Sequence, residues 1–335
     1  MNSTTQAVPR LARVSDVSAD LLSIIVPVYN ELAVLPAFHA RLMGAVACVP
    51  AQLEILYVDD GSTDGSSLCL SALQSTDRTV GVLRFSRNFG KEQAISAGLQ
   101  HARGDAAVVI DADLQDPPEL IGSMMQAWRE GADMVNMRRR CRAGETWLKR
   151  ATAHVFYRAI NALSDVHIPP DVGDFRLLSR RAIDALNAMP ERTRFMKGLF
   201  AWIGFEQVTI EYDRGPRAAG RSKWRYWRLW NLALEGITGF STAPLKAASY
   251  AGIFSAMAAL IYAVYFLIKT LTVGDPVSGF PTLIVTMLFL GGIQLVALGV
   301  LGEYVSRLAV EVKHRPLYLI DRFDPPHTAA KRAAR

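Results

Sequence analysis

Two common phosphate-binding motifs are missing from this sequence. No G-x-G-x-x-G follows the first apolar run near residue 22, and no G-x-x-x-x-G-K-[ST] occurs anywhere in the chain. These glycine-rich loops hold the phosphates of nucleotides through their backbone N–H groups. Their absence excludes the usual dinucleotide-binding and P-loop classes, so a nucleotide bound here needs another means of neutralising its phosphates.

The chain is also poor in cysteine and has no apolar segment near its start. Cys48, Cys69 and Cys141 lack metal-ligand spacing and cannot form a full set of disulfides, which fits a reducing compartment. The first 20 residues are polar and contain no hydrophobic region of the signal-peptide type. We therefore expect no signal peptide and a disordered arm over residues 1–21.

Two long runs lack charged residues altogether. They extend from Ala247 to Ile268 and from Pro281 to Gly302, and each is 22 residues long. At ~1.5 Å per residue, a helix of that length crosses a hydrocarbon core of ~30 Å. A pair of buried helices in a soluble core is the alternative, but two uncharged runs of this length are rare outside membranes. The composition therefore predicts two transmembrane helices.

Basic residues flank the two runs and are scarce between them. The loop that joins the runs holds only Lys269 and Asp275 as charged residues. Positively charged flanks stay on the cytoplasmic side, so both termini are expected to be cytoplasmic and the short loop external. The flanking residues are Arg214, Arg217, Arg221, Lys223, Arg225, Arg228 and Lys246 before the first run, and Arg307, Lys313 and Arg315 after the second.

Residues 22–135 alternate between strand-like and helix-like segments, as in "LSIIVPVYN" followed by "ELAVLPAFHARLMGAV". This alternation predicts a mostly parallel sheet with helices on both faces. In such sheets the ligand binds at the carboxyl ends of the strands. Polar residues cluster after four of the expected strands, so we expect a binding site at this edge. The clusters are Asn30-Glu31, Asp59-Asp60, Arg87-Asn88 and Asp111 to Asp116.

The last of these clusters places three carboxylates, Asp111, Asp113 and Asp116, directly after the apolar residues Ala107–Ile110, in a chain of formal net charge +6. Burying unpaired carboxylates of like charge is costly, so a positive partner is expected, either a basic side chain or a metal ion. Mg²⁺ and Mn²⁺ favour oxygen ligands and share one or two carboxylates with substrate phosphates. Because the usual phosphate motifs are absent, we favour a metal bound together with a diphosphate.

Several motifs follow one another in an order that resembles glycosyltransferase family 2. They are "IIVPVYNE", "VDDGSTDG", "RNFGKEQAISAGL", "DADLQDPPE", "GDFRLL" and "GRSKW", with paired membrane spans ending in "GEYVSRL". Within that family the chain resembles the polyisoprenyl-phosphate glycosyltransferases, which include dolichol-phosphate mannose synthases and bactoprenol glucosyltransferases. The resemblance covers about residues 22–320. It implies a GT-A fold, a nucleotide-sugar donor and a polyprenyl phosphate acceptor.

The resemblance also assigns roles to individual residues. Asp111 and Asp113 match the family's aspartate-x-aspartate motif and would be catalytic, carrying Mg²⁺ or Mn²⁺ with Gln115 close by. Asp174 lies where hydroxyl-using relatives keep their base. Because the acceptor here is a phosphate, we assign Asp174 instead to orienting sugar hydroxyls or a basic partner such as Arg176. The remaining implied residues are Pro27, Tyr29, Asn30, Glu31, Asp60, Lys91, Asp111, Arg221 and Lys223 for the donor, and Arg138 and Arg150 for the acceptor phosphate.

Simpler structural roles remain open for some of these residues. Asp59 and Asp60 could cap a helix that begins within "GSTDG", and Tyr29 could be a core aromatic. The basic segment that contains Arg138 and Arg150 could be a solvated or lipid-facing patch. Arg221 and Lys223 could be positive-inside anchors of the first span.

Together these expectations describe a membrane-bound inverting glycosyltransferase of the bacterial inner membrane. It would move a sugar, most simply glucose from UDP-glucose, to undecaprenyl phosphate for cell-envelope glycan or lipid modification. The alternative is an inactive membrane adaptor or flippase component that retains a nucleotide-binding fold. We expect no nucleic-acid partner, whereas the resemblance implies a homo-oligomer (a tetramer) and leaves room for a flippase and a downstream lipid-sugar-dependent transferase. The expected organisation is a GT-A domain over 22–212, interfacial helices over 213–245, transmembrane helices over 246–270 and 281–305, and a cytoplasmic tail over 306–335.

Overall fold

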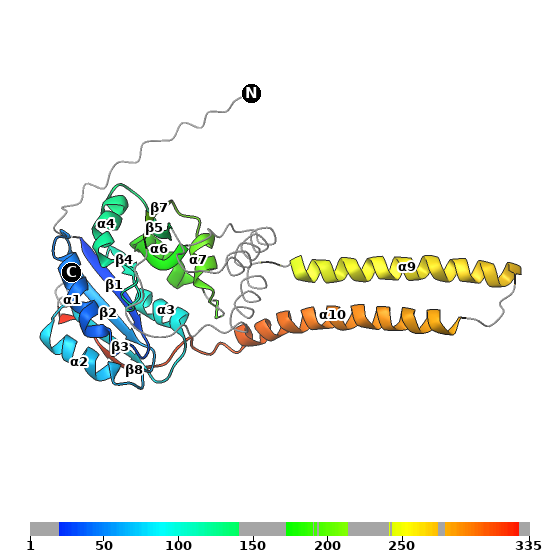
Figure 1. Cartoon of the computed structure of the whole chain (residues 1–335), viewed down its shortest axis with the longest axis horizontal. Coiled ribbons are helices and arrows are strands. Elements are labelled where there is room, and N and C mark those ends of the chain that lie inside the picture. Colours follow the sequence, from blue (N-terminus) through cyan, green and yellow to red (C-terminus); the bar gives the residue numbers. More distant parts are fainter. Residues whose placement is uncertain are drawn as a thin grey trace, which may run out of the picture. The chain divides into compact units, whose positions relative to one another are not determined.

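The computed structural model describes residues 20–140, 172–189, 191–192, 194–213, 241, 243–273 and 279–327. The chain divides into two compact units (Figure 1). The first comprises residues 1–154, 168–224 and 316–335, and the second comprises 155–167 and 225–315. Within the described residues, the first unit holds a single sheet with its covering helices and the second holds two long helices.

The sheet of the first unit has eight strands in the order β7-β5-β6-β4-β1-β2-β3-β8. The central strands pair in parallel, β4 with β1, β1 with β2 and β2 with β3, whereas β6 is antiparallel to both of its neighbours. The predicted mostly parallel sheet is therefore confirmed. The strands are β1 (Leu21–Val28), β2 (Gln52–Asp59), β3 (Val80–Phe85), β4 (Ala106–Val109), β5 (Met134–Arg139), β6 (Val172–Ser179), β7 (Gln207–Tyr212) and β8 (Ile320–Asp324).

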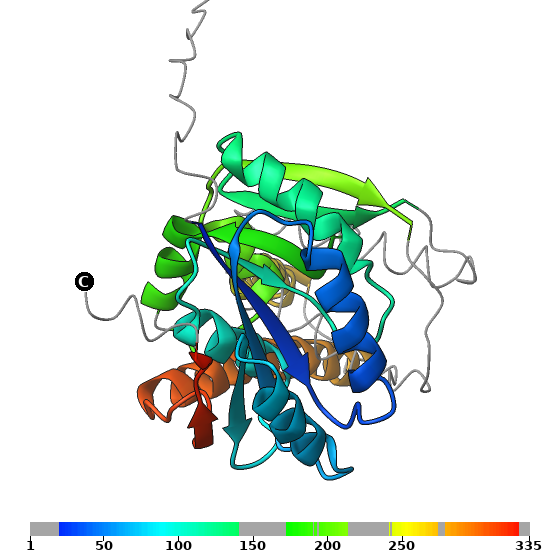
Figure 2. The ribbon, with the colours of Figure 1, turned by 90° about the vertical axis from the view of Figure 1, so that its left-hand side faces the viewer.

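Helices cover both faces of this sheet, as the alternating sequence pattern predicts (Figure 2). α1 and α4 pack on one face, where Phe38, Leu42, Met124 and Trp128 are almost fully buried in the main core. α3 and α6 lie on the other face. The described helices are α1 (Leu35–Val46), α2 (Ser66–Thr76), α3 (Lys91–His101), the 3₁₀ helix η1 (Pro118–Leu120), α4 (Ile121–Arg129), α6 (Arg180–Ala188), α7 (Met196–Trp202), α9 (Ala243–Val273) and α10 (Phe280–Val312).

The last strand, β8, lies within residues 306–335, which the sequence analysis predicts to be a cytoplasmic tail. It pairs antiparallel with β3, so that Val82 lies opposite Asp324. The ring of Tyr318 stacks on that of Phe85 with centroids 4.8 Å apart, and Gln74 of α2 donates a hydrogen bond of 3.0 Å to the carbonyl of Asp324. The chain that follows both long helices is thus part of the sheet of the first unit.

In the second unit, α9 and α10 have 31 and 33 residues and extend beyond the spans expected over 246–270 and 281–305. By length and composition each could cross a membrane, over Ala243–Tyr262 and Phe289–Val312. None of either window is buried inside the structure, which is not the pattern of two helices in a soluble core.

α3 packs closely on β1 because one of its positions has no side chain. A Cβ added at Gly98 would lie 2.2 Å from Cγ2 of Ile25, a fully buried β1 residue. Gly44 in α1 is the opposite case, since nothing lies within 4 Å of a Cβ built there. The close approach at Gly98 fixes α3, and with it Lys91 at the start of the helix, against the centre of the sheet.

We expect Gly98→Ala to destabilise the protein relative to Gly44→Ala. Both changes gain about 1 kcal/mol of helix propensity. The difference in unfolding free energy between the two variants therefore reports the clash with Ile25. Overpacking of this kind costs about 1–3 kcal/mol. Denaturation of the purified full-length chain in detergent measures this difference. Equal stability of the two variants would contradict close packing of α3 on β1.

Candidate active site at the carboxyl edge of the sheet

The sheet brings the predicted polar clusters to one edge. β1, β2 and β4 are parallel neighbours, and their pairing places Val28 opposite Asp59 and Ile25 opposite Val109. The residues that follow these strands must therefore emerge at the same edge. This arrangement gathers the donor-site candidates Tyr29 to Glu31, Asp60 and the acidic segment Asp111 to Asp116 at one edge of the first unit.

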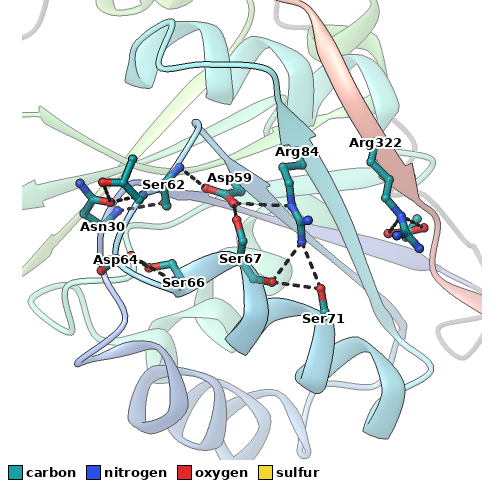
Figure 3. A network of polar contacts seen from close by, with 11 residues as sticks. Asn30, Asp59, Ser62, Asp64, Ser66, Ser67, Ser71, Arg84 and Arg322 are labelled. Carbon is teal, nitrogen blue, oxygen red and sulfur yellow. Dashed lines mark hydrogen bonds and ion pairs between the residues drawn. The ribbon is translucent and has the colours of Figure 1, made fainter.

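The loop after β1 is fastened to the turn after β2 by hydrogen bonds (Figure 3). The backbone N–H of Asn30 donates to Ser62 Oγ at 3.0 Å, and its side-chain oxygen accepts from the N–H of Thr63 at 2.8 Å. Asn30 has φ of 56°, a conformation that asparagine tolerates better than most residues. Tyr29 is 38% exposed, so it is not the core aromatic that the sequence left as an alternative.

Asp59 is fully buried and organises the turn that follows it. Its Oδ1 accepts from the N–H of Ser62 at 2.9 Å, its Oδ2 accepts from the hydroxyl of Ser67, and Arg84 lies 3.8 Å away (Figure 3). α2 begins after Gly65, with no side-chain cap. The alternative role of Asp59 as a cap of this helix is therefore not what the structure shows.

Asp60 holds a different segment, the loop between β3 and α3. Its carboxylate accepts from the backbone N–H groups of Phe89 at 2.6 Å and Gly90 at 2.9 Å. Burial raises the pKa of Asp60, and these two hydrogen bonds partly oppose that rise. Gly61 lies so close to this loop that a Cβ would be 2.5 Å from the backbone carbon of Arg87. Like Asp59, Asp60 does not cap α2.

The positive partner of the acidic segment in this structure is a lysine. The ammonium of Lys91, the first residue of α3, lies 2.7 Å from Asp111 and 2.5 Å from Asp174 on β6. Burial and the charge of Asp174 raise the pKa of Asp111 although Lys91 opposes them. Burial would also raise the pKa of Asp174, but Lys91 and Lys197 outweigh it and lower that pKa. Lys91, rather than Arg176, is therefore the basic partner of Asp174.

The predicted metal ligands supply only oxygen donors. Asp113 and Gln115 follow Asp111 in the loop after β4, and the N–H of Gln115 donates to Asp113 Oδ1 at 3.1 Å. Among the described residues, no group of three or more His, Cys, Asp or Glu side chains is placed to hold a metal. Mg²⁺ and Mn²⁺ at phosphate sites use one or two carboxylates together with substrate oxygens. The donor set of Asp111, Asp113 and Gln115 fits that mode of binding.

The two arginines at the end of β5 point to opposite faces of the sheet. Arg138 is exposed and forms an ion pair with Glu211 of β7. Arg139 is hydrogen-bonded to Tyr212, whose hydroxyl donates to the buried Asp116 at 2.5 Å. Arg139, which the sequence reasoning passed over, is thus the arginine on the side of the acidic segment. The alternation of side chains along β5 could have revealed the position of Arg139. Val135, Met137 and Arg139 lie on the same face of the strand, and Val135 and Met137 are core residues.

The other predicted cations cannot be placed. Arg150, Arg221 and Lys223 lie outside the described residues, so their proposed contacts with phosphate remain predictions. Pro27 is the last but one residue of β1, where it lies opposite Val58 of β2. Of the predicted donor and metal residues that are described, all lie at or next to the carboxyl edge of the parallel strands.

Comparisons with known proteins identify the family to which this chain belongs. The Glycosyl transferase family 2 profile matches residues 23–186, and the GtrB C-terminal hairpin profile matches residues 243–308. An uncharacterized glycosyltransferase of Synechocystis sp. is 49% identical over 89% of this chain and 94% of its own length. A bactoprenol glucosyl transferase of Shigella phage SfV is 47% identical over 89% of this chain and 97% of its own. The chain belongs to glycosyl transferase family 2.

This family membership confirms the GT-A class and the enzymatic character inferred from the sequence. Among solved structures, a mannosyltransferase from Pyrobaculum calidifontis in complex with GDP-Man and Mn²⁺ is 16% identical and covers 89% of this chain and 88% of its own, with a TM-score of 0.46. The two matched profiles together show a family 2 domain followed by a C-terminal hairpin in this glycosyltransferase.

Glu92 is the other perturbed acid next to this site. Burial and the nearby charge of Asp174 raise its pKa to about 7, against the opposing charges of Lys91 and Lys197. A carboxyl group whose pKa is raised in the folded chain binds its proton more tightly there than in the unfolded chain. Its ionisation therefore costs folding free energy as the pH rises from its ordinary pKa of 4.5 to about 7.

We expect Glu92→Gln to be more stable than the wild type at pH 8, by up to about 3 kcal/mol. The difference should shrink as the pH falls and vanish below about 4.5, where both residues are neutral. Thermal unfolding across this pH range measures it. Glu119→Gln is the control of opposite sign, because Arg41 lowers the pKa of Glu119, so that variant should lose a few tenths of a kcal/mol at neutral pH. A pH-independent difference for Glu92→Gln would contradict the raised pKa.

Proposed function

We propose that this glycosyltransferase moves glucose from UDP-glucose to undecaprenyl phosphate, with inversion at the anomeric carbon. The observation that carries the proposal is the 47% identity with a bactoprenol glucosyl transferase over 97% of that protein. The match to the GtrB C-terminal hairpin over residues 243–308 supports a lipid substrate held at a membrane. The product would be a polyprenyl-phosphate sugar that serves cell-envelope glycan or lipid modification.

The donor would bind at the carboxyl edge of β1, β2 and β4. Pro27, Tyr29, Asn30, Glu31 and Asp60 would surround the base and ribose, on loops that the hydrogen bonds of Asn30 and Asp60 already hold together. This preorganisation lowers the entropy that nucleotide binding costs. Arg221 and Lys223 would reach the diphosphate, together with Lys91.

Asp111, Asp113 and Gln115 would hold Mg²⁺ or Mn²⁺, which supplies positive charge to the leaving diphosphate. With that ion and the donor in place, the ammonium of Lys91 need not neutralise Asp111 alone and can contact a phosphate oxygen. Asp174 would remain beside the sugar. The chain's part in the reaction is thus to hold the donor in line and to stabilise the charge of its leaving group.

The acceptor needs no general base. A phosphate monoester has a second pKa near 6, so roughly nine tenths of it is dianionic at pH 7 and can attack directly. Arg138 and Arg150 would bind this phosphate. Because Arg138 is paired with Glu211, binding of the acceptor would exchange one carboxylate partner for a phosphate.

The enzyme would act at the bacterial inner membrane, with α9 and α10 as its spans and both termini in the cytoplasm. The basic flanks of the two helices and the hairpin match support this arrangement. Assembly into a homo-oligomer, cooperation with a flippase and supply of a downstream lipid-sugar-dependent transferase remain predictions.

Incubating membranes that contain the protein with undecaprenyl phosphate and radiolabelled nucleotide sugars tests the proposal. We expect a labelled lipid from UDP-glucose with added Mg²⁺ or Mn²⁺, and none in excess EDTA. Asp113→Ala should abolish transfer, whereas Asp184→Ala, a change of an exposed side chain of α6, should not. Full activity of Asp113→Ala in EDTA would refute the metal site. Absence of lipid labelling from every donor would instead favour the inactive adaptor.

The acceptor residues can be tested separately from the donor. Charged hydrogen bonds contribute ~1.5–3 kcal/mol each, so Arg138→Ala and Arg150→Ala should each lower kcat/KM for the acceptor by roughly 10- to 150-fold. Affinity for UDP-glucose, measured by titration with metal, should stay within a few-fold. Glu211→Gln is the matched control, since it frees Arg138 and should not weaken acceptor use. Loss of donor binding with normal acceptor kinetics would place these arginines at the diphosphate.

A further inference from the structure

Two carboxylates beside the ion pair of Lys91 each have one oxygen that accepts no hydrogen bond from the described part of the chain. Asp174 Oδ2 is held by Lys91, but Asp174 Oδ1 is buried and accepts no hydrogen bond. The backbone N–H of Met196 donates to the carboxylate of Glu92, whose Oε2 is likewise buried and accepts none. Each acid therefore has one oxygen occupied by a structural contact and one oxygen that still requires a donor.

Such oxygens are costly unless something supplies the missing donor. Leaving a buried acceptor unsatisfied destabilises a protein measurably, so native structures rarely keep two of them together without a reason. The two acids are also close enough for the charge of Asp174 to raise the pKa of Glu92. A ligand that fits here must present two O–H or N–H groups within a few ångströms of each other.

The surrounding charges favour a neutral ligand over an anion. Three acids, Glu92, Asp111 and Asp174, face three bases, Lys91, Arg176 and Lys197, so the formal charges cancel. Arg176 is 3% exposed, its guanidinium lies 3.8 Å from the centre of the Phe200 ring, and it donates to the carbonyl of Gly173 at 2.7 Å. These two contacts hold the guanidinium in place, although its Nε is buried without a hydrogen-bond partner among the described residues. The two carboxylate oxygens are the acceptors that remain for hydroxyl donors.

The positions of the two acids connect them to the reaction. Glu92 follows Lys91 in the first turn of α3, and Lys91 contacts both Asp111 and Asp174. The side chain of Asp174 is 19% exposed although its Oδ1 is covered, so a hydroxyl group reaches Oδ1 once the side chain turns. A pyranose carries adjacent hydroxyls that are both donors, and it is neutral. Its ring therefore provides the groups that these two oxygens lack.

On the basis of the proposed function, we propose that Glu92 binds a hydroxyl of the donor sugar beside Asp174 and thereby helps to determine which sugar is transferred. The charges of Lys91 and Lys197 favour the ionised form of both acids, and they hold the pKa of Asp174 below its ordinary value, whereas the pKa of Glu92 stays raised. Glu92 would then discriminate among sugars by hydrogen bonding. A site built to bind a hydroxyl rejects analogues that lack it far more strongly than an apolar pocket can.

Glu92→Gln in the full-length enzyme tests this assignment, because the amide keeps the shape of the side chain but replaces one acceptor with a donor. The probes are UDP, UDP-glucose and the 2-, 3-, 4- and 6-deoxy derivatives of UDP-glucose, in binding titrations and in transfer assays. We expect kcat/KM for UDP-glucose to fall roughly 10- to 150-fold, with UDP affinity unchanged. For one deoxy donor, the one that lacks the hydroxyl bound by Glu92, the variant should equal the wild type.

Other outcomes decide against the assignment. Equal losses for UDP-glucose and all four deoxy donors, or a parallel loss of UDP affinity, would make Glu92 a structural residue. Glu119→Gln, the same change on an exposed side chain paired with Arg41, should leave all five sugar donors unaffected. Cooperative unfolding of Glu92→Gln, with a stability equal to or above that of the wild type, excludes misfolding as the cause. If the wild type binds UDP-glucose but labels no lipid, the proposed function fails while the binding titrations still test Glu92.

Discussion

The contact of Lys91 with Asp111 and Asp174 organises the chemistry of this enzyme. It joins three elements, the start of α3, the loop after β4 and the strand β6, at the carboxyl edge of the sheet. Without a cation, these two partly buried carboxylates would repel each other, and the loop that carries the aspartate-x-aspartate motif would lose one of its contacts. A lysine suits this task better than an arginine because its compact ammonium can be released to a phosphate without breaking a bidentate pair.

The packing of α3 sets where this lysine can be. Gly98 lets the helix approach Ile25 of β1, and Asp60 binds the amides of Phe89 and Gly90 just before the helix begins. The same acid that is proposed to face the nucleotide therefore also positions Lys91, which is proposed to reach the diphosphate. In that proposal, one loop would couple binding of the base to binding of the phosphates.

Much of this could be predicted from the sequence. The strands β1 to β4 and the helices α1 to α3 follow strong local patterns, and the acids at their ends are conspicuous. What escaped prediction depends on contacts between distant segments. The positions of the antiparallel strands β6 and β8 depend on pairing with other strands, and no local sequence pattern identifies those partners. Arg138 and Arg139 are adjacent in sequence and chemically identical, and only the face of β5 on which each lies separates them. Glu92 carries no signal of its own, since its environment comes from Asp174, Lys197 and Met196.

The position of β8 has a consequence for biosynthesis. β3 ends at Phe85, whereas its edge partner begins at Ile320, after both long helices have been made. At ~5–20 residues per second, the ribosome needs roughly ten to fifty seconds to deliver that partner. During this interval the edge of β3 is an unpaired strand, the kind of edge that invites association with other chains. The catalytic sheet is therefore closed last, when the hairpin of α9 and α10 is complete, so a nascent chain that stalls within the hairpin would carry an unfinished domain.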